Sequence, residues 1–111
     1  MKAGLCPDYP VMVNDWLSST KITLLTPAEE GAFWRLLCHA WNEPDCTLPN
    51  DDKALASLSR LGASWAQGSG TTIRSCFDAD PARPGRIFNA VQRATREIQM
   101  GRIADAKSPN S

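Results

Sequence analysis

The clearest helix in the sequence is TPAEEGAFWRLLCHAW, which spans Thr26–Trp41. It begins with a capping box: the Thr26 side chain can accept the Glu29 amide, Glu29 can reach back, and Pro27 sits where no backbone donor is needed. Apolar side chains then recur three and four residues apart, at Phe33, Leu36, Leu37, Ala40 and Trp41. The pattern predicts an amphipathic helix that buries this face and ends before Pro44.

Shorter helices are expected after a loop that contains Pro44 and Pro49. Asn50-Asp51-Asp52 places a cap and two acids at the start of a helix that stops at Gly62. Its core face carries Leu55, Leu58 and Leu61.

A further helix is predicted in two pieces. It restarts around Trp65 but is broken by Gly68-Ser69-Gly70, because each glycine within a helix costs about 1 kcal/mol relative to alanine. Helical structure resumes near Thr71, and the spacing of Ile73 and Phe77 places both side chains in the core.

The end of the chain predicts a small hairpin and a last helix. Residues 78–85, DADPARPG, are turn-rich, and the alternating stretch 86–89 is expected to pair with residues 75–78. The last helix follows Asn89; its predicted core face holds Val91, Ala94, Thr95 and Ile98, with Arg93 and Arg96 turned elsewhere. We expect one domain over residues 1–106 and a frayed tail over residues 107–111.

The predicted fold class is therefore mainly α with a small β-hairpin. Three helices followed by a hairpin is the order of a winged helix-turn-helix, in which the third helix enters a DNA groove and the hairpin lies on the backbone.

Composition agrees with one globular domain, since the chain has 111 residues of which 42% are hydrophobic and 22% charged. The sequence has no uninterrupted apolar stretch of the ~18 residues that a membrane span needs, and no apolar secretion-signal core near its start. These observations predict a cytoplasmic protein with no membrane partner.

The charge is divided between the two halves. Residues 1–52 hold three basic and eight acidic side chains, net −5, whereas residues 53–111 hold nine basic and four acidic, net +5. Either the basic half faces a polyanion while the acidic half faces another partner, or the two halves interleave and neutralise each other.

Several motifs together resemble the YdaU-like family of phage and prophage proteins. They are Tyr9-Pro10, Asn14–Leu17, Leu25–Leu37, Trp41 and Leu48–Asp52 ahead of Leu55, and the resemblance covers roughly residues 9–90. It implies similarity to the N-terminal winged-helix domain of phage replication initiators, and hence DNA binding in phage replication, with no catalytic residues to carry over. Members commonly continue into a Lys- and Arg-rich tail, which is not present here.

Phosphate contacts would come from basic side chains near the third helix and the hairpin. Arg74 lies on the expected recognition helix, and Arg83 and Arg86 flank the hairpin tip, so these three are the first candidates for duplex DNA binding; Arg60 and Lys53 complete the set. The alternative is that they are ordinary solvated charges, some of them paired with Asp78 and Asp80.

The rival function is a phage-encoded protein-binding module that inhibits a host protein or defence system, for example an anti-CRISPR protein. Its candidate interface is Trp34 with Glu30, because Trp34 is displaced by about 100° from the predicted core face. The other tryptophans, Trp16, Trp41 and Trp65, are more easily explained by core packing than by stacking on bases.

No enzymatic, metal or cofactor site is expected. His39 is the only histidine and has no nucleophile or carboxylate arranged with it, and no phosphate-binding glycine loop is present. With no secretion signal, the cysteines are interpreted as reduced thiols, with Cys38 and Cys76 in the core; the full set is Cys6, Cys38, Cys46 and Cys76.

Overall fold

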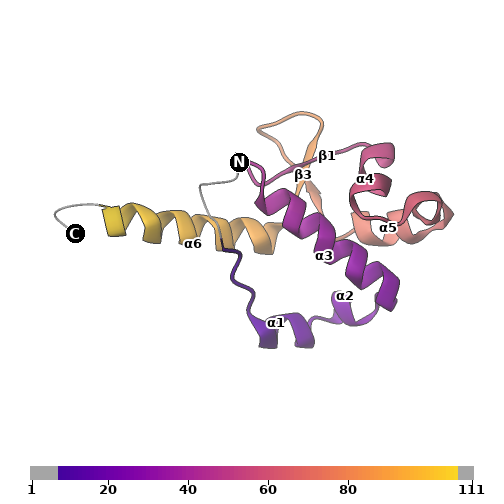
Figure 1. Ribbon diagram of the computed structural model, residues 1–111, viewed down its shortest axis with the longest axis horizontal. Helices are drawn as coiled ribbons and strands as arrows, with labels where there is room; N and C mark the ends of the chain where they lie inside the picture. Colours follow the sequence, from indigo (N-terminus) through magenta and orange to yellow (C-terminus); the bar gives the residue numbers. More distant parts are fainter. Residues whose placement is uncertain (1–7, 108–111) are drawn as a thin grey trace.

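The computed structural model describes residues 8–107, which form a mainly helical fold with a small antiparallel sheet (Figure 1). The predicted mainly α fold with a small β-hairpin is confirmed. The winged-helix arrangement stays a prediction. The elements in chain order are α1 (Val13–Ser18), α2 (Thr20–Thr23), α3 (Pro27–Trp41), β1 (Leu48–Pro49), α4 (Asp52–Leu58), the 3-10 helix η1 (Gly62–Gln67), α5 (Ser69–Arg74), β2 (Asp78–Ala79), β3 (Arg86–Phe88) and α6 (Ala90–Lys107).

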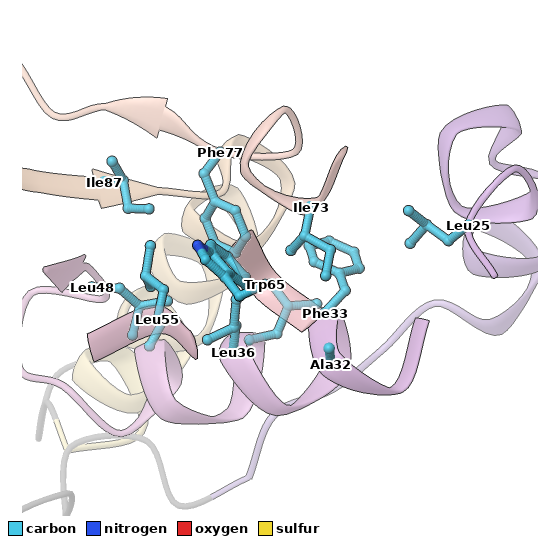
Figure 2. Close-up of a cluster of buried hydrophobic side chains, with 12 residues drawn as sticks. Leu25, Ala32, Phe33, Leu36, Leu48, Leu55, Trp65, Ile73, Phe77 and Ile87 are labelled. Atoms are coloured by element: carbon cyan, nitrogen blue, oxygen red, sulfur yellow. The ribbon is translucent and has the colours of Figure 1, made fainter. Parts of the chain in front are cut away.

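Helix α3 is the centre of the fold and begins with the predicted capping box. The Glu29 amide donates to Thr26 Oγ1 at 3.1 Å, and the Thr26 amide donates to Glu29 Oε1 at 3.0 Å. Every residue of the predicted core face is buried, so that prediction is confirmed. Figure 2 shows part of this face packed among side chains from α4, η1, α5, the α5–β2 connection and β3, namely Leu55, Trp65, Ile73, Phe77 and Ile87.

The sheet has three strands in the order β1-β3-β2. The predicted hairpin is present, but its first strand is Asp78–Ala79 and not residues 75–78; Asp78 of β2 lies opposite Phe88 of β3. The third strand, β1, was expected to be loop; it pairs Leu48 with Ile87 and buries both side chains. Its second residue is Pro49, which an edge strand tolerates because no ladder donor is required there.

Helices α4 and α5 differ from their predicted bounds. Helix α4 ends at Leu58, short of Gly62, and Arg60 then takes a left-handed φ of 71° as the chain turns into η1. Helix α5 begins at Ser69 instead of Thr71. Gly70 lies inside it and does not break it: a Cβ at this position would lie 2.6 Å from Trp65 Nε1, so glycine allows α5 to pack on η1.

The predicted core face of α6 is wrong. Val91 is 74% and Ile98 56% exposed, whereas Gln92 and Arg96 are buried. The reason is polar: Gln92 Nε2 donates to the Leu37 carbonyl at 2.7 Å, and the Arg96 guanidinium donates to carbonyls at the end of α3. Hydrogen bonding, not hydrophobicity, selects the face that α6 turns to the core.

The cysteines also differ in part from expectation. Cys38 is exposed, because it lies on the outer side of α3, so its assignment to the core is wrong; Cys76 is half-buried and Cys46 is buried. Cys6 and residues 108–111 of the predicted tail lie outside the described residues. None of the helices formed within residues 8–107 has the length and hydropathy that crossing a bilayer requires.

Candidate functional site

The predicted nucleic-acid side is built from α5, the β2–β3 connection and the segment that leads into α4. An open depression of about 360 Å³ lies between α5 and the sheet. Its lining combines polar groups with the edge of the core: Asn50, Thr71, Arg74, Ser75, Phe77, Ala79 and Ile87.

Arg74 is tied to the start of α4. Its guanidinium donates to the Asn50 side-chain oxygen and pairs with the Asp52 carboxylate. The Trp65 indole donates to the same carboxylate at 2.9 Å. The Trp65 hydrogen bond and the Arg74 contact together lower the pKa of Asp52. The one cation of the expected recognition helix is thus neutralised within the fold.

Arg83 belongs to a network centred on Asp80. This carboxylate is only 4% exposed and accepts from Arg93, Arg83 and the Ala82 amide at 3.0, 3.0 and 2.9 Å. The Arg93 hydrogen bond, helped by the other donors, lowers the pKa of Asp80 to about 2. Arg83 also pairs with Asp45 at 3.2 Å. The network holds the β2–β3 connection in place, and the charge of Arg83 is paired within it.

Arg86 faces the loop after α3 instead of solvent. It pairs with Glu43 at 3.1 Å and donates from Nε to Thr47 Oγ1 at 2.9 Å. Asp45 lies in the same cluster; its partial burial raises its pKa, but the Thr47 hydrogen bond and the two arginines outweigh burial and lower it. All three of the first candidates for DNA binding therefore have carboxylate partners, as the alternative interpretation allowed.

The remaining two candidates differ from these three. Lys53 and Arg60 are exposed, and no ion pair among residues 8–107 involves either of them. They lie on α4 and just after it, so among the five candidates the positive charge without an acidic partner lies there and not on α5 or the hairpin. Four arginines of α5, the β2–β3 connection, β3 and α6 pair with four acids, which reduces the field that could attract phosphate; the arginines are Arg74, Arg83, Arg86 and Arg93, and the acids are Asp52, Asp45, Glu43 and Asp80.

A second candidate site lies between α1 and the first half of α3. It is an apolar groove of about 460 Å³. Its lining is Val11, Val13, Trp16, Leu17, Pro27, Glu30, Gly31 and Trp34. Large apolar side chains are exposed in the groove, at Val13 and Leu17, and beside it in the chain, at Met12. An exposed apolar patch of this kind is typical of an interaction surface.

Both residues of the predicted protein interface line this groove. Trp34 is 39% exposed, stacks on Tyr9 at 5.7 Å between ring centroids, and meets Trp16 edge-on at 5.8 Å. Glu30 Oε2 accepts the Trp16 indole proton at 2.8 Å, so its carboxylate is fixed in the groove. Trp41 and Trp65 are buried, as core packing predicted, and Trp16 is half-buried.

The sequence analysis did not identify the groove residues of α1. Val13 and Leu17 lie four residues apart on α1 and both are exposed, and neither was assigned to a site from the sequence. The sequence signal that could have found them is their spacing of four residues, which places both side chains on one side of a helix.

Possible metal ligands and thiols are two kinds of reactive side chain within residues 8–107. Within residues 8–107, no three His, Cys, Asp or Glu side chains are grouped closely enough to hold a metal ion. Burial raises the pKa of the Cys38 and Cys76 thiols, which lowers the fraction of reactive thiolate at neutral pH.

No protein-family model, no curated protein and no solved structure matches the chain. The YdaU-like resemblance stays a prediction that depends on the residues quoted above.

Proposed function

We propose that this chain is a winged-helix DNA-binding accessory protein of a phage or prophage, active in replication or transcription, with weak affinity for DNA on its own. The observation that carries the proposal is topological. Elements α3, β1, α4, η1, α5, β2 and β3 follow one another as helix, strand, helix, 3-10 helix, helix, strand, strand, and the strands are ordered β1-β3-β2. A winged helix-turn-helix needs a helix pair followed directly by a hairpin, and this order supplies both.

In this proposal α5 is the groove-facing helix and residues 80–85 form the wing. Helix α5 and the residue after it expose short polar side chains, Thr71, Thr72 and Ser75, and Arg74 is half-buried beside them. Hydroxyl groups of this kind bind phosphate oxygens or base edges. The link to phage replication or transcription rests on the resemblance to the YdaU-like family.

Low affinity follows from the ion pairs. Lys53 and Arg60 are the candidates with free charge, and Arg74 can add a third contact only by exchanging Asp52 for a phosphate. Two or three phosphate contacts predict a log–log slope of affinity against salt of roughly −2 to −3. Such a protein needs either a second DNA-binding unit or a protein partner to hold a site at cellular salt.

The test is fluorescence anisotropy with a labelled DNA duplex over a salt series. Lys53→Ala combined with Arg60→Ala should make the slope shallower by about two units on every sequence. Arg35→Ala, which removes an exposed arginine from α3, is the matched control and should leave the slope unchanged. Absence of binding at low salt, or an unchanged slope in the double variant, would refute the assignment.

The groove favours a second candidate function, a protein-binding module that inhibits a host protein or defence system such as a CRISPR system. Helix-in-groove recognition uses an apolar cleft of this kind. Capture of one purified host protein that is lost in Trp34→Ala and retained in Lys53→Ala/Arg60→Ala would favour this function over DNA binding.

A further inference from the structure

A lysine of the short helix α2 lies at the end of α5. Lys21 Nζ donates to the backbone carbonyl of Ser75, the residue that follows α5, at 2.8 Å. The ammonium group is therefore held at the C-terminal end of the expected groove-facing helix. Lys21 was counted with the acidic half of the sequence and assigned to no site, because it lies 54 residues before Ser75 and local spacing does not reveal the contact.

Lys21 keeps its charge available for an anion. Its side chain is exposed, and no ion pair among residues 8–107 involves it. A lysine ammonium group has three N–H donors, and the Ser75 carbonyl accepts one of them. The same hydrogen bond restricts a long, flexible side chain before any ligand arrives, so less side-chain entropy is lost when a phosphate binds.

The arginine of α5 itself is in a different situation. Arg74 pairs with the Asp52 carboxylate, and the Trp65 indole also donates to that carboxylate at 2.9 Å. A phosphate that displaced Asp52 would exchange one anion for another and would lie beside a carboxylate whose side chain is 76% exposed. Like charges at this distance repel each other. Arg74 therefore gains little from a phosphate, whereas Lys21 gives up no ion pair of the described fold to bind one.

Lys21 and the exposed cations of the α4 region lie on two sides of α5. Lys53 is on α4 and Arg60 follows that helix, and in Figure 1 α4 and α2 flank α5 from opposite sides. Ser75 also lines the depression between α5 and the sheet, so the ammonium group of Lys21 lies at its rim. The phosphates of both strands border the major groove, so a helix in the groove can be held by cations on both of its sides.

We propose that Lys21 binds a DNA phosphate beside α5 and supplies the third phosphate contact in place of Arg74. The inference rests on the proposed function, because it adds a residue to the same interface. Lys21, Lys53 and Arg60 then make three contacts, and at about −0.9 for each contact the log–log slope of affinity against salt is about −2.7. If Lys21 only closed the end of α5 through its hydrogen bond, its charge would have no effect on DNA binding.

The experiment is fluorescence anisotropy of the full chain with a labelled DNA duplex over a salt series. Lys21→Gln keeps an N–H donor for the Ser75 carbonyl but removes the charge, so it should make the slope shallower by about 0.9. Lys21→Arg keeps both the charge and the donor and should retain the wild-type slope. Thermal unfolding should show that both variants keep the fold, because the side chain is exposed.

Arg35→Gln is the matched control, since Arg35 is an exposed cation of α3 that takes part in no ion pair among residues 8–107. It should leave the slope unchanged. A wild-type slope in Lys21→Gln would overturn the inference while DNA binding through Lys53 and Arg60 still stood. An equal loss of slope in Lys21→Gln and Arg35→Gln would also overturn it, because binding would then respond to net charge and not to the position of Lys21. Absence of binding by every variant at low salt would overturn the proposed function, and this inference with it.

Discussion

Replacing Arg96 tests the unexpected polar face of α6. The guanidinium donates to the Trp41 carbonyl, to the Glu43 carbonyl at 3.2 Å and to the Pro44 carbonyl at 3.3 Å, and it lies 4.6 Å from the centroid of the Trp41 ring. It therefore closes the C-terminal end of α3, where carbonyls lack helical partners and a positive charge is favourable. Arg96→Met keeps the apolar stem and removes every one of these interactions.

The expected cost can be assembled from the contacts. Losing the donor of a buried carbonyl costs about 1–3 kcal/mol, and the two carbonyls that water can reach cost about 0.5–1 kcal/mol each. The cation–π contact adds about 0.5–1 kcal/mol. Because these losses overlap, Arg96→Met should lower the free energy of unfolding by about 2–5 kcal/mol, a large part of the stability of a domain of this size.

Urea unfolding followed by circular dichroism measures this loss. Arg102→Met is the matched control on the same helix, since Arg102 is exposed, and it should change the unfolding free energy by no more than about 0.5 kcal/mol. If Arg96→Met and Arg102→Met had the same small effect, Arg96 would not be holding α6 to the end of α3.

Four other predictions follow from local geometry. Thr26→Ala removes the capping box of α3 and should cost about 1 kcal/mol in urea unfolding, whereas Thr26→Ser should cost little. Gly70→Ala places a methyl group against Trp65 and should cost about 1–3 kcal/mol; no loss would mean that α5 and η1 are not in contact. Asp80 has a folded pKa of about 2, below its unfolded value near ~3.9, so its contribution to stability is present above about pH 4 and is lost as the pH falls toward 2; the urea midpoint of Asp80→Asn should not show this acid-dependent loss. Burial raises the pKa of Tyr9, the only tyrosine, to about 12; an ultraviolet titration midpoint near the ordinary value of about 10 would show that it does not pack on Trp41.

Local patterns predicted the parts of the fold that local interactions specify. The start and buried face of α3 depend on residues within a few turns of one another, and both were predicted correctly. The face of α6 was not, because Arg96 is paired with carbonyls more than fifty residues earlier in the chain. From the sequence alone, a buried arginine cannot be distinguished from an exposed one, because the groups that it binds lie elsewhere in the chain. Strand β1 was missed because two residues are too few to show alternation.

In the candidate sites too, features set by local spacing could be predicted and features that depend on distant residues could not. Trp34 and Glu30 could be placed on one side of a helix from spacing alone, and the groove brings them together. The basic residues could be named from the sequence, but their ion pairs could not, because Arg74, Arg83 and Arg86 meet acids that are distant in the chain, such as Asp52, Asp45 and Glu43. These ion pairs join acids of residues 1–52 to arginines of residues 53–111, which agrees with the alternative that the two oppositely charged halves neutralise each other.

The most direct test of the proposed function is amide chemical-shift mapping of the protein during titration with a short DNA duplex at low salt. The proposal predicts that the largest shifts fall on α5, on residues 80–85 and around Lys53 and Arg60, and that they reverse when salt is added. Shifts confined to α1 and the groove side of α3, or no shifts at all, would contradict DNA binding by this fold.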